Sequence, residues 1–244
     1  MTAVKLFDPF SRKAGISIAE FSHHWITHHA EIVTRIPRVR RYIQSLRLEV
    51  AVPSGADRFP APRWDGCAET WHDDPSSIAA MVDEPLFGEL MADERNFLDL
   101  SAGRDLIVTT ETVLDEDGFD PRVRGVKMMV FARRHPSSSP SDFRRSWEAD
   151  LAAAGRTLGV TRHVVCTAIG DVHRAADAAS TDANAQPAAA QGFSGVRELW
   201  WPDIASLTAS IGRHPDLIRR IVAPEGVDPA RSTTLVVRER VIVP

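Results

Sequence analysis

The sequence of 244 residues predicts an α+β fold in which two ferredoxin-like βαββαβ units, one after the other, form a pseudo-dimeric α+β barrel. Three observations predict it. Short motifs recur in the same order along the chain, and each copy follows the pattern strand, helix, strand, strand, helix, strand. In such a unit both helices cover one sheet face and leave the other apolar. Two units packed face to face cover these apolar faces and can enclose a cavity.

Four blocks carry the repeat, which is the strongest signal in the sequence. The first half supplies them in order, and the second half repeats them in the same order. They are Val4–Phe7 with Val126–Met129, Ser17, Phe21 and Trp25 with Ser139, Phe143 and Trp147, Gly66–Trp71 with Gly195–Trp200, and Ile107–Leu114 with Leu235–Ile242. We therefore expect a first unit over residues 1–114, a linker over 115–125 and a second, degenerate unit over 126–244.

The elements of the first unit follow from local signals. Ser17 with Glu20 predicts a capping box that opens a helix, and Pro37 ends that helix after about Ile36. The polar residues Asp93, Glu94 and Asp99 predict a solvated turn after the second helix. The remaining expected elements are strands Val4–Phe7, Tyr42–Val52, Gly66–Trp71 and Leu106–Leu114, a loop Pro53–Arg63, and a helix Ile78–Met91 interrupted near Pro85. In the second unit, the Ala-rich segment 174–192 predicts a mobile loop.

Composition excludes several classes of function. The net charge of −4 without a basic stripe argues against a nucleic-acid partner. No apolar run approaches the ~20 residues that cross a bilayer, so we expect no membrane partner. Cys67 and Cys166 are too few for a disulfide scaffold or a structural zinc site. We therefore expect a cytoplasmic enzyme or small-molecule binding protein, and self-association into a homodimer stays open.

The segment from Phe21 to His29 (FSHHWITHH) is the chemically richest part of the sequence. His24 and His28 have the i, i+4 spacing of metal ligands, but no third ligand of suitable spacing accompanies them, so we expect no metal. Helical periodicity puts His28 and His29 just beyond the two edges of the apolar face, and it does not choose between them.

His29 lies one turn after Trp25, so the two side chains can touch. An imidazole beside an indole, with a pKa near neutrality, suits general acid or base catalysis. The alternative is a core histidine that binds a backbone carbonyl group. Tyr42, the only tyrosine of the chain, could orient a carbonyl or phenol oxygen, or could be a buried and satisfied tyrosine.

The sequence resembles the EthD family of dimeric α+β barrel proteins over most of residues 4–114. The residues that carry the resemblance are Ser17-x3-Phe21-x3-Trp25-x3-His29-Ala30, Pro37 with Tyr42, Asp65-Gly66-x2-Glu69, and Ala92-Asp93-Glu94-x2-Phe97-x-Asp99. The resemblance implies the same barrel, favours His29 over His28, and implies small-molecule chemistry without an organic cofactor. EthD-like proteins are associated with xenobiotic ether breakdown and with polyketide and aromatic pathways. Related barrels act as decarboxylases, dehydratases, isomerases and cofactor-free oxygenases.

The second copy departs from this pattern. Leu151 stands where the first copy has His29, and His163 stands where it has Tyr42. Asp93 falls opposite Val222. A histidine needed only for folding should be kept in both copies, so its loss favours a functional role for His29.

Other candidates carry weaker signals. Trp25 and Phe21 could form an apolar wall for a substrate, and His28, Asp65 and His163 are further candidate substrate-binding residues. Capping of a turn is the favoured interpretation of Asp65, and His163 could face His29 across the barrel. Glu69 and Glu198 occupy matched positions, which favours a structural role for both.

The preferred hypothesis is an enzyme that binds a hydrophobic, aromatic or polyketide-like carbonyl compound. His29 would move a proton and Tyr42 would orient the oxygen, which makes the enzyme a lyase, dehydratase or isomerase. The alternatives are a cofactor-free oxygenase on similar substrates and a non-catalytic barrel that only binds the small molecule.

Overall fold

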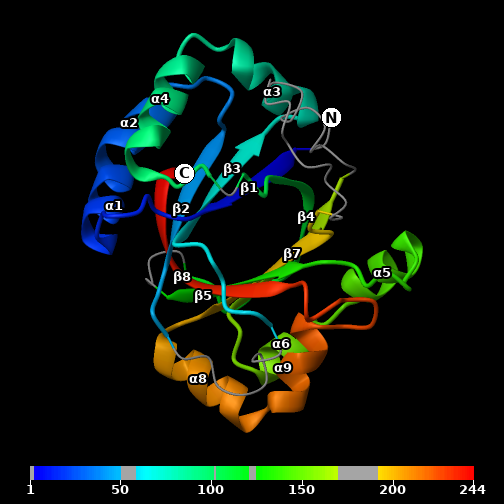
Figure 1. The fold of residues 1–244 in the computed structure, drawn as a ribbon. Coiled ribbons are helices and arrows are strands. Elements are labelled where there is room, and N and C mark those ends of the chain that lie inside the picture. Colours follow the sequence, from blue (N-terminus) through cyan, green and yellow to red (C-terminus); the bar gives the residue numbers. More distant parts are fainter. Residues whose placement is uncertain (1–2, 51–58, 102, 121–124, 170–191) are drawn as a thin grey trace.

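The computed structural model of the protein describes residues 3–50, 59–101, 103–120, 125–169 and 192–244, and its strands close into one barrel (Figure 1). The strands are β1 (Val4–Phe10), β2 (Arg41–Arg47), β3 (Gly66–His72), β4 (Ile107–Asp115), β5 (Val126–Ala132), β6 (Arg162–Ala168), β7 (Gly195–Trp201) and β8 (Thr233–Val243). Their order around the barrel is β1, β3, β2, β8, β5, β7, β6, β4, and each pair of neighbours is antiparallel.

This order confirms the predicted fold class. Each half has the ferredoxin-like sheet order, with its first and third strands in the centre and its second and fourth at the edges. The edge strands also pair between halves, β2 with β8 and β4 with β6. The two sheets therefore form one hydrogen-bonded barrel without free edges.

The helices lie outside the barrel, in two groups. Figure 1 shows α1, α2 and α4 on one side of the barrel and α6, α8 and α9 on the opposite side. Their bounds are α1 (Ile18–His24), a π-helical segment η1 (Trp25–His29), α2 (Ala30–Thr34), α3 (Pro75–Ala79), a 3-10 segment η2 (Ala80–Asp83), α4 (Phe87–Phe97), α5 (Pro140–Trp147), α6 (Ala152–Thr157), α8 (Ile204–Arg213) and α9 (Pro215–Val222). Within the described residues, no helix combines the length and the apolar composition that crossing a membrane requires.

Successive side chains of each strand alternate between the barrel interior and the helix-covered outside. On β1, Phe7 belongs to an apolar cluster inside the barrel, to which Met129 of β5 and Val196 of β7 also contribute. On β2, Tyr42 instead packs beneath α2 and α4. This alternation determines which side chains line the barrel interior and which pack against the helices.

Four charged side chains meet inside the barrel, where all of them are buried. Lys5 Nζ lies 2.5 Å from Glu198 Oε2 and 2.8 Å from Glu69 Oε2. Lys127 Nζ lies 2.5 Å from Glu69 Oε1 and 2.8 Å from Glu198 Oε1. Burial acts to lower the pKa of Lys5, but the facing carboxylates raise it well above its ordinary value. Each repeated Lys therefore binds a carboxylate of its own half and one of the other half.

The repeated glycines Gly66 and Gly195 have a packing role. A Cβ atom at Gly66 would lie 2.7 Å from the ring of Trp25, and one at Gly195 would lie 2.5 Å from the ring of Trp147. Each tryptophan thus rests directly on the backbone of a strand, which only glycine permits. Both members of this contact recur in both halves, which accounts for two blocks of the repeat.

Most expected elements of the first half are present, with shifts at their ends. The strand expected over Tyr42–Val52 ends at Arg47, because its last partner on β3 is Gly66, opposite Leu46. The single helix expected over Ile78–Met91 is α3, η2 and α4, and α4 continues to Phe97. The expected loops at 53–63 and 174–192 lie largely outside the described residues.

Candidate active site

The helix that carries the histidines begins and bends as the sequence dictates. Ser17 Oγ accepts from the backbone N–H of Glu20, and the Glu20 carboxylate accepts from the backbone N–H of Ser17, which is the expected capping box. Between α1 and α2 the segment Trp25–His29 is π-helical, and the Ala30 N–H donates to the Trp25 carbonyl five residues earlier. Such π segments occur frequently at functional sites.

The π segment distinguishes His28 from His29, which helical periodicity alone leaves equivalent. An i→i+5 turn accommodates one residue more than an α-helical turn, so the next side chains are rotated relative to a regular helix. The His29 side chain is 8% exposed, and that of His28 is 61% exposed. The structure therefore turns His29 inward, toward α4, and leaves His28 at the surface.

Asp93 of α4 faces the histidines and binds two of them directly. Its Oδ2 lies 2.9 Å from His29 Nδ1, and its Oδ1 lies 2.7 Å from His24 Nε2. His28 Nε2 is 3.5 Å from the same Oδ1. The Phe97 ring, one turn after Asp93, has its centroid 5.0 Å from that of His29. The Asp93 carboxylate thus lies close to the imidazole groups of His24, His28 and His29.

The expectation of a solvated turn at Asp93 and Glu94 is wrong. Both residues lie within α4 and are only 4% exposed, because the helix runs on past Met91. Asp99 does cap a turn, accepting from the backbone N–H of Ser101. The polarity of these residues predicts solvent, but Asp93 meets His24 and His29, more than 60 residues away, and Glu94 meets Arg104.

Electrostatics favours a neutral imidazole beside an ionised carboxylate. Burial lowers the pKa of His29, and the hydrogen bond to Asp93 opposes this only in part. Burial acts to raise the pKa of Asp93, but hydrogen bonds from His29 and His24 outweigh it and lower that pKa. Since a carboxylate only accepts, we assign the proton of neutral His29 to Nδ1. Its Nε2 is then the basic nitrogen, and it has no hydrogen-bond partner among the described residues.

A second ion cluster holds α4 against the sheet. The Arg104 guanidinium binds Asp8 of β1 and lies 2.6 Å from Glu94 Oε2. Burial raises the pKa of Glu94, and Arg104 opposes this effect. Because Glu94 is adjacent to Asp93, this bridge fixes the part of α4 that presents Asp93 to His29.

Trp25 and Tyr42 come together, but in a separate network. The Tyr42 hydroxyl accepts from Trp25 Nε1 and from Gln44 Nε2, both at 3.0 Å, and Gln44 Nε2 also donates to the Trp25 carbonyl at 2.7 Å. Burial raises the pKa of Tyr42 well above its ordinary value, so the phenol stays protonated. Within the described residues, no hydrogen bond joins Tyr42 to His29.

The other predicted site residues have varied surroundings. Phe21 packs on Trp25 with ring centroids 5.6 Å apart. Asp65 accepts from the backbone N–H of Arg12 at 2.9 Å and from Arg12 Nη1 at 3.0 Å. Its role is therefore structural, but it binds a segment 53 residues away and does not cap the local turn that its place before Gly66 suggests.

His163 does not face His29 across the barrel. It lies on β6 of the second half, where its Nε2 is 2.8 Å from Arg197 Nη1 and its ring is next to Gly155. Its neighbours Val164 and Cys166 point or pack inward, whereas His163 points to the helices outside. Side chains alternate along β6, so an inward Cys166 places His163, three residues earlier, on the outer face. This alternation is the sequence signal that indicates the position of His163.

The groupings of possible metal ligands among the described residues lie inside the barrel, not at the histidines. They are Glu111, Cys166 and Glu198, and Glu69, Glu198 and Glu239. Lys5 and Lys127 already contact these carboxylates, so ammonium groups serve as their cationic partners.

Comparison with known proteins identifies the first half and the fold. Residues 13–101 match the EthD domain family. The comparison with curated proteins gave no match. The span of the family match includes both His29 and Asp93, and it confirms the resemblance that the motifs indicate.

Solved structures match nearly the whole chain at low sequence identity. An anthrone oxidase-like protein has a TM-score of 0.62 at 9% identity and covers 99% of this chain and 94% of its own. A proposed monooxygenase from Fusobacterium nucleatum has a TM-score of 0.56 at 7% identity, with coverages of 98% and 93%. A chlorite dismutase variant from Candidatus Nitrospira defluvii has a TM-score of 0.54 at 9% identity, with coverages of 98% and 92%. These likenesses show a common fold.

Proposed function

Because residues 13–101 form an EthD domain, we propose that the chain is a cofactor-independent enzyme in which His29 acts as general base and acid on a hydrophobic carbonyl compound. The observation that carries this proposal is the 2.9 Å contact between His29 Nδ1 and Asp93 Oδ2. A base oriented by a carboxylate is the recurrent arrangement for proton transfer in enzymes.

The chemistry follows from the tautomer. With its proton on Nδ1, His29 presents the lone pair of Nε2 and can remove a proton from the carbon next to a carbonyl group. The imidazolium that forms is stabilised by Asp93, which stays ionised. His29 can then return the proton to carbon or to oxygen, which makes an isomerase, dehydratase or lyase reaction the expected class.

Loss of the pair in the second half supports a functional role. The positions aligned with His29 and Asp93 are Leu151 and Val222. Leu151 precedes α6, and Val222 is buried among apolar residues. The second half therefore folds without either member of the pair, so the fold alone does not require them.

Aromatic side chains around the pair favour an apolar substrate. The Phe97 ring contacts both His24 and His29, and it packs on Phe21, which in turn packs on Trp25. The half-exposed His24 and the exposed His28 connect this cluster to the surface. Because Phe21, Trp25 and Phe97 are themselves buried, an aromatic or polyketide-like compound would approach this apolar cluster from the side of His24 and His28, with its acidic C–H toward His29.

A second candidate is cofactor-free oxygenation at the same pair. The anthrone oxidase-like protein and the monooxygenase of similar fold favour it. Here His29 would deprotonate an electron-rich substrate, which would then react with molecular oxygen. The remaining hypothesis is a barrel that binds a small molecule without catalysis. A ligand that is bound without chemical change would support it.

The test is depletion of a panel of aromatic and polyketide carbonyl compounds, followed by mass spectrometry in air and without oxygen. Wild type, His29→Ala and Asp93→Asn are compared with His23→Ala, which removes an exposed histidine of the same helix. We expect turnover to fall about 10²–10⁴-fold in His29→Ala and to be unchanged in His23→Ala. Equal turnover in a folded His29→Ala variant would falsify the role of His29, and strict oxygen dependence would select the oxygenase.

A further inference from the structure

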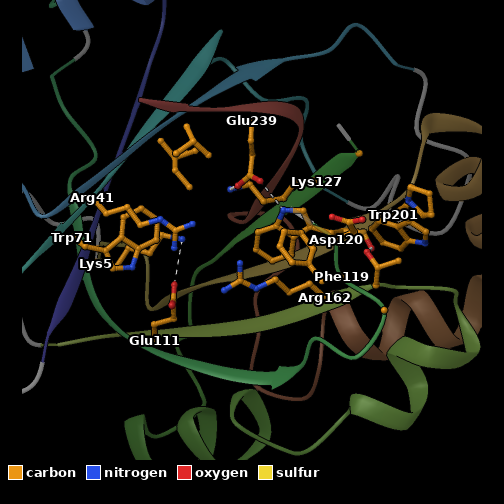
Figure 2. A pocket seen from close by; sticks show the side chains of 17 residues that line it. Lys5, Arg41, Trp71, Glu111, Phe119, Asp120, Lys127, Arg162, Trp201 and Glu239 are labelled. Atoms are coloured by element: carbon orange, nitrogen blue, oxygen red, sulfur yellow. Dashed lines mark hydrogen bonds and ion pairs between the residues drawn. The ribbon is translucent and has the colours of Figure 1, made fainter. Parts of the chain in front are cut away.

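A cavity of about 200 Å³ lies inside one end of the barrel (Figure 2). Arg41 of β2 and Arg162 of β6 reach into it from opposite sides, as Figure 2 shows. The indoles of Trp71 and Trp200 line it as apolar walls. The cavity thus combines cationic and aromatic surfaces, a combination distinct from the histidine cluster.

The cavity belongs to the opposite face of the sheet from the His29–Asp93 pair. Arg41 and Tyr42 are consecutive on β2 and therefore point to opposite faces. Tyr42 packs beneath α2 and α4, on the helix-covered side, whereas Arg41 lines the interior. The wall of the barrel separates the two sites.

The same row of side chains enters the cavity from each half. In the strand register, Trp71 pairs with Lys5 on one side and with Arg41 on the other. The second half repeats this row as Lys127, Trp200 and Arg162. Lys5 Nζ and Arg41 Cζ lie 4.4 and 4.7 Å from the Trp71 ring centroid, and the equivalent distances to Trp200 are both 5.1 Å. Each indole is therefore held between two cations.

The lysines of these rows already have carboxylate partners. Beyond Glu69 and Glu198, Lys5 lies 3.5 Å from Glu111 and Lys127 lies 2.7 Å from Glu239. Glu111 and Glu239 also line the cavity. Each of these carboxylates contacts an ammonium group, but four carboxylates share two ammonium groups. The positive charges of Arg41 and Arg162 offset the other two, so what distinguishes the arginines is their hydrogen bonding.

The arginines differ from the lysines in this respect. Among the described residues, the Arg41 side chain has neither a hydrogen bond nor an ion pair, and its Nε is buried without a partner. The Nε of Arg162 is likewise buried without a hydrogen bond, and its nearest carboxylate, on the exposed Glu116, is 3.8 Å away. Buried guanidinium nitrogens are rarely left unpaired, because the lost hydration is costly. Two of them around one cavity indicate a ligand that accepts hydrogen bonds, as an oxyanion does.

The size of the cavity and the geometry of its arginines indicate which kind of oxyanion it can bind. A guanidinium whose face lies on an indole keeps its edge N–H groups for a planar oxyanion, and a carboxylate matches that fork. Sites for drug-sized ligands have about 300–1,000 Å³, so this cavity suits a molecule of about one ring. We propose that it binds a small aromatic carboxylate, which accepts hydrogen bonds from Arg41 and Arg162 and packs its ring on Trp71 and Trp200.

The test is isothermal titration of the full chain with benzoate and with benzamide, its neutral counterpart of similar shape. Arg41→Gln and Arg162→Gln are compared with Arg238→Gln, which removes the same charge from an exposed position of β8. We expect benzoate to bind at least about tenfold more tightly than benzamide. We expect each cavity variant to weaken benzoate binding about tenfold or more, as loss of a charge-assisted hydrogen bond does, and Arg238→Gln to leave it unchanged.

The outcomes separate this site from the catalytic proposal. Benzoate binding that survives in His29→Ala but weakens in Arg41→Gln and Arg162→Gln supports the cavity. Binding that is lost in His29→Ala and retained in the arginine variants would move the ligand to the histidine cluster and overturn the inference. Equal binding of benzoate and benzamide, or none of benzoate, would also overturn it. The comparison of benzoate with benzamide uses the wild type, so it tests the preference for an anion even if an arginine variant fails to fold.

Discussion

Glu69 of β3 and Lys127 of β5 form a fully buried ion pair across the two halves of the barrel, with Oε1 and Nζ 2.5 Å apart. The two residues are 58 positions apart in the chain, and no strand pairing joins β3 to β5. The contact therefore passes through the interior of the barrel. It links the halves independently of the hydrogen bonds at their edges.

Loss of one partner of this pair should destabilise the protein strongly. In Lys127→Met, the carboxylates of Glu69 and Glu198 would lose one of their two ammonium partners while remaining buried. Removing one partner of a buried pair typically costs about 3–5 kcal/mol of unfolding free energy. Urea denaturation measures the change. Arg40→Met, which breaks the exposed pair with Asp73, is the control and should leave the unfolding free energy nearly unchanged. A similar small change in both variants would contradict this account.

A methyl group at either repeated glycine should also destabilise the fold. In Gly66→Ala the new Cβ would meet the Trp25 ring at 2.7 Å, and in Gly195→Ala it would meet Trp147 at 2.5 Å. Overpacking of this kind costs about 1–3 kcal/mol. Thermal denaturation should show the loss in both variants. Gly212→Ala in α8 meets no atom within 4 Å and should be neutral or stabilising. Equal melting temperatures for all three variants would be the contrary result.

The unfolding free energy should decrease as the pH falls, because two histidines are buried in the folded protein. Burial lowers the pKa of His72 to about 4, and burial together with Arg197 lowers that of His163 to about 3. Unfolded histidine has a pKa of about 6.5. Between that value and the folded values the unfolded chain binds more protons, so the unfolding free energy falls as pH decreases. Each histidine contributes up to about 1.4 kcal/mol per pH unit in that window.

His163→Gln isolates one of these contributions, since the amide oxygen can still accept from Arg197. Unfolding free energies measured from pH 7 to pH 4 should fall less steeply in the variant than in the wild type. Parallel curves for the two proteins would show that His163 does not titrate as its burial implies.

Once a substrate is found, the pH dependence of turnover should report His29. A neutral base is required, so kcat/KM should fall on the acidic side with an apparent pKa below 6.5, in the direction that burial shifts His29. Asp93 raises the pKa of His29, so Asp93→Asn should move this acidic limb to still lower pH while reducing the maximal rate. An acidic limb that stays in place in Asp93→Asn would separate Asp93 from the base.

Much of the fold could be predicted because its signals are local or repeated. The capping box of Ser17 and Glu20, and the recurring Gly66 and Trp25, depend on residues a few positions apart or on a pattern that appears twice. His29 could be singled out because the second copy lacks it. The polarity of Asp93, in contrast, predicts a solvated turn, because it carries no information about a partner 64 residues away.

The sequence by itself determined the tandem units, the α+β class and a histidine that only one copy carries. Only the tertiary structure decided which polar groups meet. Closure of the barrel brought Arg41 and Arg162 to one cavity, and packing of α4 on the first helix brought Asp93 to His29. The reason is physical: propensity and periodicity act over a few residues, whereas hydrogen bonds and ion pairs between buried groups depend on long-range packing.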